Sequence, residues 1–554
     1  MSTLLVTGVA VTAGPVLASA STPAQHVLLI SVDGLHASDV TQCIHDHLCP
    51  NLTNLTLHGT TYANVQTSQP SDSSPGLMAL MTGATPALTG VYYDDSYDRT
   101  LYAPAAQTES GTQTCTGLPG AETMYAENID KNAPSVANGG VGTRPILGDT
   151  IDPTQLPYGV VNGKCVPIWP NDFLRTNSIM SVIHAAGLRT AWADKHPAAM
   201  QEISGHGTPN TVDDRFLSEI NADIIPPSLT DTRGRVVSFP LPNPTGTGPF
   251  FITDSVGDTE SYDQTKVDAV LNEIDGLNSG GKVHVGTPAI FGMNFQTVSV
   301  AEKLVDPMQS CVRITPSPAG CDPNYVPGGY EPGTLKFTPQ LAGAIASVDN
   351  ALGSMVAELS AQGLLSSTKI IVTAKHGQSP IDPSSLAKIG HAEDTVLSNA
   401  GINVAQTTDD DISLLWLKSQ SQTPAAVAAL KASQANGNPA RIKDLYYGPS
   451  MIAKFDNPLS DPRTPDIIIQ PLHGTIYSTS KAKVAEHGGF LADDTHVEMV
   501  IANGSALGVP GHEMTVTNHV TTMQVAPTIL STLGLDPAAL DAVKIQGVQV
   551  LPQS

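Results

Sequence analysis

Several side chains that could catalyse ester hydrolysis lie at the ends of apolar, strand-like segments or at the start of a helical pattern. A serine hydroxyl can act as the nucleophile, while imidazole and carboxylate groups can carry protons or bind a divalent metal. A buried lysine can supply a fixed positive charge or, if its pKa is lowered, a base. The residues concerned are Asp33, Ser73, Lys375, His376 and His487.

The element that must position Asp33 is the segment His26–Val32, which is continuous, apolar and rich in β-branched residues. Such a segment is typical of a strand buried on both faces of a parallel sheet. Lys369–Val372 has the same character and precedes Lys375 and His376. Because open α/β folds place their chemistry at the carboxyl ends of such strands, these residues are candidates for a common site.

Ser73 belongs to the segment SQPSDSSPGLMALMTG, in which Pro75 suits the first turn of a helix. A hydroxyl at this place lies near unpaired backbone N–H groups and the positive end of the helix. The alternative interpretation is that Ser73 or Ser74 only caps the helix.

Further strand-like and helical segments alternate along the chain. This alternation predicts an α/β fold with a mainly parallel central sheet between helices, as a single domain over residues 21–554. Residues 100–175 are rich in Thr, Gly, Pro and Asn and are expected to form a loop-rich insertion. The expected strands include Thr190–Ala193, Ala289–Met293, Ile370–Thr373, Ser413–Leu417, Asp466–Ile469 and Met499–Ala502, and the expected helices include Thr176–Ala186, Tyr262–Leu277, Thr338–Leu364, Ala425–Ala435 and Thr522–Leu533.

Charge and cysteine content narrow the class of protein. The 27 Lys and Arg residues against 51 Asp and Glu residues give a formal net charge of −24, whose average field would repel a nucleic-acid polymer. The six cysteines follow one another as three pairs, and short loops favour the disulfides Cys43–Cys49 and Cys311–Cys321, which leaves Cys115–Cys165. The alternative is a cytosolic protein with free thiols.

The N-terminal residues indicate export. The apolar segment Leu4–Leu17 is followed by Ala18-Ser19-Ala20, a pattern typical of a secretory signal that is cleaved near Ala20. An ordinary flexible N-terminus is the alternative. No later segment approaches the about 18 apolar residues of a membrane helix, so we expect a secreted or periplasmic protein without a membrane span.

The order of the motifs resembles the alkaline phosphatase superfamily, specifically its type I phosphodiesterase and nucleotide pyrophosphatase branch. Val32-Asp33-Gly34 matches the Asp-Gly motif at the end of the first strand. Ser73-Ser74-Pro75-Gly76 leads, with the family spacing, to Thr82-Gly83-Ala84-Thr85-Pro86. The motifs AKHG, EHGGF and QVAPTILSTLGL follow in the same order, so the resemblance spans roughly Val27–Gly534. It implies an alkaline phosphatase-like fold, a small-molecule substrate that is a phosphoric mono- or diester, and Ser73 as the nucleophile.

The resemblance also implies metal ligands, but part of the family set is missing. The family uses two zinc ions about 4 Å apart. Lys375 replaces an aspartate that binds the nucleophile-side metal, and the expected Asp-x-x-x-His pair reads Gln296-Thr297-Val298-Ser299-Val300. We therefore expect at most one divalent ion, with zinc as the first choice, and no dinuclear zinc site. The family ligands that remain are Asp33, Ser73, His376 and His487.

Two loops supply the predicted substrate-binding residues. The family frame Gly-x-x-x-Asn-x-x-Tyr-Asp is kept at Gly90–Asp98, but Asp94 stands where the family asparagine donates to a phosphoryl oxygen. Lys195 and His196 follow the strand-like segment Thr190–Ala193 and correspond to a substrate-facing loop of the family. A solvated loop without a role is the alternative for these two residues.

Lys375 leaves the mechanism open. Its ammonium could replace a metal ion by pairing with Asp33 and Asp94, or a lowered pKa could make it the base for Ser73. Nearby carboxylates would instead raise its pKa and keep it charged. The leading hypothesis is a phosphoric ester hydrolase with an at most mononuclear metal site. The alternatives are a metal-free Ser-Lys hydrolase of another ester and a catalytically inactive binding protein.

Overall fold

The computed structural model describes residues 24–125, 129, 146–147, 151–222, 224–240, 251–304, 328–480, 483–510 and 513–552. The expected signal peptide and the expected Cys311–Cys321 pair lie outside these residues. Among the helices that are described, none has an apolar stretch long enough to cross a bilayer.

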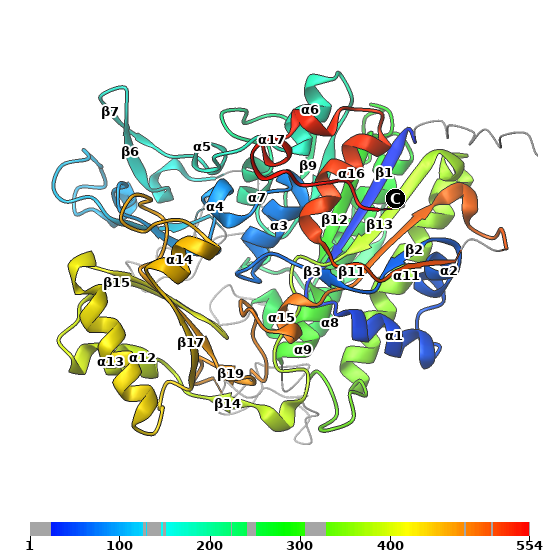
Figure 1. The fold of residues 1–554 in the computed structure, drawn as a ribbon. Helices are drawn as coiled ribbons and strands as arrows, with labels where there is room; N and C mark the ends of the chain where they lie inside the picture. The colour runs from blue at the N-terminus through cyan, green and yellow to red at the C-terminus, as the bar shows by residue number, and fades with distance from the viewer. Residues whose placement is uncertain are drawn as a thin grey trace, which may run out of the picture.

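The largest element of the fold is an eight-stranded sheet with the strand order β21-β2-β20-β13-β1-β12-β8-β9 (Figure 1). The strands from β13 to β9 run parallel to one another, whereas β20 runs antiparallel to both of its neighbours. The strand bounds are β1 His26–Val32, β2 Thr60–Tyr62, β8 Ala191–Ala193, β9 Asp214–Phe216, β12 Ile290–Phe295, β13 Thr368–Thr373, β20 Met499–Asn503 and β21 Met514–Val516.

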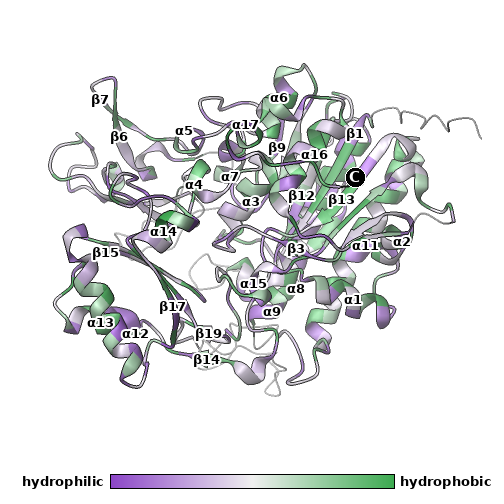
Figure 2. Cartoon of the chain, in the orientation of Figure 1, coloured by the Kyte–Doolittle hydropathy of each residue, from purple (hydrophilic) through white to green (hydrophobic). Residues whose placement is uncertain are grey.

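Strand β1 lies in the centre of this sheet between β12 and β13. Its residues from Val27 to Val32 are buried, and the central strands are hydrophobic along their length (Figure 2). A strand covered on both faces needs apolar side chains in both directions, which explains why its sequence is continuous rather than alternating.

Helices cover the sheet on two sides (Figure 1). Helices α2, α8, α9 and α11 contact one another in one group, and α3, α6 and α16 contact one another in a second group. The predicted α/β fold with a mainly parallel sheet between helices is therefore confirmed. The helix bounds are α2 Pro50–His58, α3 Ser73–Thr82, α6 Ile179–Ala185, α8 Val256–Ile274, α9 Thr297–Lys303, α11 Pro339–Ala361 and α16 Val525–Thr532.

Two of the expected strands belong to a second, antiparallel sheet with the order β15-β16-β18-β17. This sheet packs with helices α12 and α13 around a separate apolar core that includes Leu397, Leu415 and Leu430. The sequence pattern identifies strands but not their partners, because any apolar strand can be buried in either sheet. The bounds are β15 Val404–Asp409, β16 Ser413–Leu417, β17 Ile442–Tyr446, β18 Ile467–Pro471, α12 Ala392–Asn399 and α13 Thr423–Ala435.

The expected insertion around residues 100–175 takes part in two short antiparallel pairings in its described part, one of them with a strand that precedes it. Strand β5 (Ala121–Met124) pairs with β4 (Asp95–Asp98), and β6 (Tyr158–Val161) pairs with β7 (Lys164–Pro167). The disulfide Cys115–Cys165 connects this region, as predicted.

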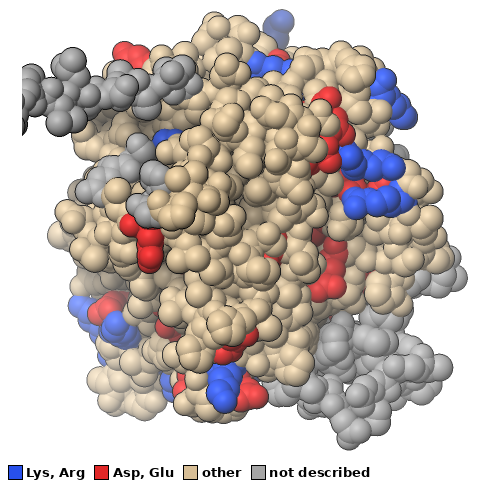
Figure 3. Space-filling model, turned by 90° about the vertical axis from the view of Figure 1, so that its right-hand side faces the viewer, with Lys and Arg blue, Asp and Glu red and all other residues tan. Residues whose placement is uncertain are grey.

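The second predicted disulfide, Cys43–Cys49, joins the end of α1 (Ala37–His45) to the residue before α2. On the surface, the face shown in Figure 3 carries separate acidic and basic side chains and no continuous basic patch. This distribution agrees with the low charged fraction of the chain, 14%.

Candidate active site

The carboxyl ends of four adjacent parallel strands form the floor of the site. Asp33 follows β1, Gln296 follows β12, Lys375 and His376 come just after β13, and Lys195 comes just after β8. These residues are far apart in the sequence, but parallel neighbours end at the same edge of the sheet. Asp33, Lys375 and His376 therefore lie together, as predicted, because β1 and β13 are neighbours in the sheet.

Ser73 is the first residue of helix α3, and Asp72 is the helix cap. One carboxylate oxygen of Asp72 accepts hydrogen bonds from the backbone N–H groups of Ser74 and Asp94, both at 3.0 Å. The cap role that was considered for Ser73 or Ser74 is thus carried by Asp72. This arrangement leaves the Ser73 hydroxyl available to the site.

Gly76 allows α3 to approach the end of strand β13. A Cβ atom at Gly76 would lie 2.4 Å from the carbonyl oxygen of Lys375, which is closer than any real contact of this kind. The missing side chain therefore sets the distance between Ser73, on the same helical turn, and the loop that carries Lys375 and His376.

The Ser73 hydroxyl lies between a cation and an imidazole. Lys195 Nζ donates a hydrogen bond to Ser73 Oγ at 2.8 Å, and His376 Nε2 lies 3.2 Å from the same oxygen. His376 Nδ1 lies 2.9 Å from the carbonyl oxygen of Gly377, and only a protonated Nδ1 can donate to that carbonyl. In the neutral ring Nε2 then has a free lone pair, which faces the serine hydroxyl.

Asp33 is fully buried and is surrounded by donors. Its Oδ2 atom lies 3.3 Å from Lys375 Nζ and 3.4 Å from Lys195 Nζ, and it accepts a hydrogen bond from Asn294 Nδ2 at 3.2 Å. Burial alone would raise the pKa of Asp33, but the charges of Lys375 and Lys195 outweigh burial and hold this pKa well below its ordinary value. Asp33 is therefore a permanent carboxylate.

Lys375 is 1% exposed, and its ammonium lies 3.3 Å from Asp33 and 3.8 Å from Asp194. Burial lowers the pKa of Lys375, but the two carboxylates, with Asp72, more than compensate, so this pKa is raised above its ordinary value. The raised pKa favours the fixed-cation interpretation of Lys375 over the base. The lysine that donates to Ser73 is Lys195.

The donors around Ser73 do not fit a zinc ion. Two ammonium groups already lie within 3.4 Å of one carboxylate oxygen of Asp33, and their positive charges oppose a further cation beside it. His487 Nδ1 lies 3.5 Å from Asp72, and the ring of His487 lies 4.2 Å from that of His376. In the described part of the chain, two groups of at least three carboxylate or imidazole ligands lie within 4.8 Å of one another, and neither group includes a residue of this site. The mechanism proposed below therefore uses no metal ion at Ser73.

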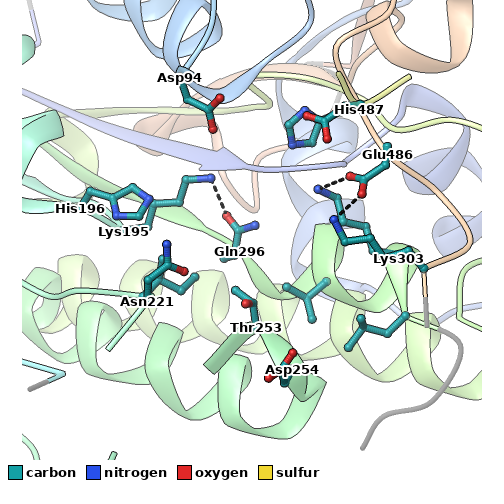
Figure 4. A pocket seen from close by; sticks show the side chains of 15 residues that line it. Asp94, Lys195, His196, Asn221, Thr253, Asp254, Gln296, Lys303, Glu486 and His487 are labelled. Atoms are coloured by element: carbon teal, nitrogen blue, oxygen red, sulfur yellow. Dashed lines mark hydrogen bonds and ion pairs between the residues drawn. The ribbon is translucent and has the colours of Figure 1, made fainter. Parts of the chain in front are cut away.

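A pocket of about 230 Å³ opens beside these residues and is lined mainly by polar side chains (Figure 4). Asp94, Lys195 and Gln296 point into it. Gln296 and Val300, the positions of the missing metal-binding pair, both line the pocket. The two positions at which that pair was expected therefore face the pocket in this chain.

A second, smaller pocket is lined by Ser73, Asp94, Lys195, Lys375 and Glu202. Burial raises the pKa of Glu202 to about 8, and the charges of Asp72, Asp194 and Asp94 act in the same direction. Glu202 is therefore mainly protonated at neutral pH. The pocket that Ser73 lines is therefore also lined by a mainly neutral carboxylic acid.

The predicted site residues are brought together to different degrees. Asp33, Ser73, His376, Lys375 and Lys195 form one connected group. By contrast, the His196 ring is directed to the buried Glu219, with Nδ1 3.1 Å from a carboxylate oxygen, although His196 lines both pockets. His487 keeps a low pKa because of burial and the nearby Lys303, and it therefore stays neutral.

Sequence reasoning missed four residues of the site: Asp72, Asp194, Asn294 and Glu202. Asp194 directly follows a predicted strand, so the strand-end rule could have found it. Asp72 precedes a proline-containing helix start, where a cap residue is expected. No local pattern marks Glu202, because its raised pKa depends first on burial and then on carboxylates from distant segments, and both arise from tertiary packing.

Comparisons with known proteins agree with this architecture. The family model of type I phosphodiesterase / nucleotide pyrophosphatase matches residues 27–223 and 226–495. Murine ectonucleotide pyrophosphatase / phosphodiesterase 5 is similar with a TM-score of 0.53 and 12% identity, over 95% of this chain and 100% of that chain. Alkaline phosphatase PafA is similar with a TM-score of 0.56 and 11% identity, over 94% of this chain and 97% of that chain.

A search of curated proteins gave no match. The structural neighbours share the fold, which confirms the expected alkaline phosphatase-like architecture. Since the family model matches most of the chain, the protein belongs to the type I phosphodiesterase / nucleotide pyrophosphatase family of the alkaline phosphatase superfamily.

Proposed function

We propose that the protein hydrolyses a phosphodiester with Ser73 as the nucleophile and with Lys195 and Lys375 in place of metal ions. The observation that carries the proposal is the position of Ser73 Oγ, 2.8 Å from Lys195 Nζ and 3.2 Å from His376 Nε2. A hydroxyl with a base on one side and a cation on the other is prepared for nucleophilic attack. Members of the family use divalent metals, so this site would be a divergent solution to the same chemistry.

In the first step, Ser73 Oγ attacks phosphorus while its proton passes to His376 Nε2. The new Oγ–P bond forms as the bond from phosphorus to the leaving alcohol oxygen breaks. The resulting imidazolium lies 3.7 Å from the carboxylate of Asp33, which stabilises its charge. The ammonium of Lys195 stabilises the charge that develops on Ser73 Oγ and on the phosphoryl oxygens.

We assign the proton for the leaving alcohol to Glu202, the neutral acid in the pocket that contains Ser73. In the second step a water molecule attacks the phosphoserine, and the Glu202 carboxylate accepts the proton of this water. The Oγ–P bond breaks, and His376 returns its proton to Ser73. The cycle is balanced, because each residue ends in its starting protonation state.

The charges around Ser73 favour a diester over a monoester. The carboxyl groups of Asp33, Asp72, Asp94 and Asp194 lie around two lysines. A dianionic monoester would meet more repulsion in this surrounding than a monoanionic diester. Asp94 also supports a second candidate function, the hydrolysis of an uncharged carboxylic ester, because a carboxylate in this place would not repel such a substrate.

The proposed function is tested with the purified chain. The substrates are four nitrophenyl compounds, a phosphodiester, a phosphomonoester, a sulfate ester and a carboxylic ester, each assayed with and without EDTA. We expect the phosphodiester to be hydrolysed with the highest kcat/KM and at an unchanged rate in EDTA. Activity confined to the carboxylic ester would select the second candidate function. A loss of activity in EDTA that added zinc restores would contradict the metal-free mechanism.

The role of Glu202 predicts a pH dependence that changes with the leaving group. Since the pKa of Glu202 is about 8, the neutral acid is lost above this pH, and release of a poorly leaving alkyl alcohol should slow as the pH rises further. A nitrophenolate leaves without a proton and serves as the matched control. Glu202→Gln should lower the rate of the first step, measured as single-turnover release of the alcohol, roughly 100-fold for the alkyl diester and much less for the nitrophenyl diester. Equal effects on both substrates would contradict this role.

We also propose that the protein is exported and that residues 21–554 form one domain. Two disulfides, Cys43–Cys49 and Cys115–Cys165, support export, because such bonds persist in oxidising compartments. Asp410 follows the last residue of β15 in the second sheet and lines the same pocket as Lys195. The second sheet thus contributes to the site, which supports a single functional unit.

A further inference from the structure

A cluster of acidic residues lies in the second sheet, away from Ser73. Helix α12 and strand β15 lie well apart from α3 in Figure 1. His391 is the residue before α12, Glu393 and Asp394 belong to its first turn, and Asp409 is the last residue of β15. We call His391, Glu393, Asp394 and Asp409 the α12 cluster.

The α12 cluster brings four ligand-bearing side chains together. One ligand atom from each residue lies within 4.8 Å of the others. His391 Nδ1 lies 2.8 Å from Asp409 Oδ2, and the Thr407 hydroxyl donates to Asp394 at 2.9 Å. The 4.8 Å is an upper bound, and two ligands on opposite sides of one divalent cation lie roughly 4 to 5 Å apart, about twice the metal–ligand distance. The four side chains could therefore surround one ion.

The buried carboxylates of this cluster have oxygens without partners. Glu393 is 0% exposed, and neither of its carboxylate oxygens has a hydrogen-bond partner. The second oxygen of Asp409 also has none. Among the described residues, no lysine or arginine forms an ion pair with the three carboxylates, and their one ionic partner is His391. Buried carboxylates of this kind need either a proton or a cation.

The first turn of α12 accounts for only part of this arrangement. The positive helix end favours acidic residues there, but it leaves the two carboxylate oxygens of Glu393 without a donor. The mutual repulsion of the Glu393 and Asp409 carboxylates adds to the cost of burying them. A cation bound among these oxygens would remove both costs at once.

We propose that the α12 cluster is a binding site for one divalent cation that accepts both oxygen and imidazole ligands, Mn²⁺ or Zn²⁺. Carboxylates suit Mn²⁺ and imidazole suits Zn²⁺, whereas calcium sites are built from oxygen alone. The ion would connect the start of α12 to the end of β15. Its function would be to stabilise the second sheet against thermal unfolding. The folded sheet contributes Asp410 to the substrate pocket with or without the ion, so the rate of hydrolysis in EDTA should stay unchanged well below the melting temperature.

The test measures binding of Mn²⁺ and, separately, of Zn²⁺ by isothermal titration calorimetry to the full chain after treatment with EDTA and dialysis. We expect one ion per chain, and a melting temperature that rises by roughly 2 °C or more at about 100-fold excess over Kd. Ser73→Ala should bind equally well, which separates this ion from the chemistry at Ser73.

Two cluster variants and one control locate the ion. His391→Ala and Asp409→Asn should each weaken binding at least about 10-fold. The side chain of His391 is 66% exposed, so its replacement should leave the fold intact even if Asp409→Asn does not. Asp444→Asn removes an exposed carboxylate of strand β17, at the opposite edge of the second sheet from β15, and should bind like the unchanged chain.

Two results would overturn the proposal. Binding that neither cluster variant weakens would place the ion elsewhere. If neither Mn²⁺ nor Zn²⁺ bound, the carboxylates of Glu393 and Asp409 would share a proton and not a metal ion.

Discussion

Replacing Ser73 by alanine is expected to lower kcat/KM for the phosphodiester at least about 1000-fold, because the variant has no oxygen that can form the bond to phosphorus. Lys195 and His376 would keep their places, since each has a second partner: Lys195 donates to Gln296, and His376 lies against Gly377. The melting temperature should therefore change little. Steady-state kinetics and a thermal melt check both expectations.

Ser74→Ala is the matched control for this experiment. Ser74 is adjacent to Ser73 and lines the same small pocket. Its backbone N–H donates a hydrogen bond to Asp72, and an alanine at this position keeps that backbone N–H. We expect this variant to keep nearly full activity. A loss of activity in Ser74→Ala together with an active Ser73→Ala would move the nucleophile by one residue and contradict the register on which the proposed mechanism rests.

Much of the fold follows from local patterns in the sequence. The segment His26–Val32 is buried on both faces, and its apolar character alone predicts that environment. The strand-end rule then predicts that Asp33, Lys375 and His376 meet, because they follow parallel neighbours in the sheet. Ser73 was predicted from the order of the motifs. Because it lies on a separate helix, no periodic pattern in the sequence connects it to these strands.

The details that decide the chemistry could not be predicted from local patterns. Lys195 and Lys375 both follow strands, but only the packed side chains reveal that Lys195 reaches Ser73 and that Lys375 lies between Asp33 and Asp194. The direction of the Lys375 pKa shift depends on how burial balances two carboxylates. Glu202 is mainly neutral at pH 7 because of its burial and because of the charges of carboxylates from distant segments. Tertiary packing, not residue type, therefore separates base from fixed cation in this site.

Because Lys375 compensates the buried carboxylate of Asp33, Lys375→Met should destabilise the chain by about 3 kcal/mol at neutral pH. In the unchanged chain the pKa of Asp33 is held low, so Asp33 contributes stability above its unfolded value, and this stability is lost as the pH falls through the folded pKa. Without Lys375, burial should raise this pKa. The free energy of unfolding of the variant should then decrease as the pH rises from about 4 to 7.

Lys369→Met is the matched control for urea unfolding at pH 5 and pH 7.5. Lys369 lies on the same strand as Lys375, is 7% exposed and, within the described residues, makes no ion pair, and burial lowers its pKa. Its replacement removes a buried ammonium without leaving a carboxylate unpaired, so it should not destabilise the chain and its stability should not fall between the two pH values. If Lys375→Met matched Lys369→Met at both pH values, Lys195 alone would suffice to compensate Asp33, and Lys375 would not be the ion that replaces the metal.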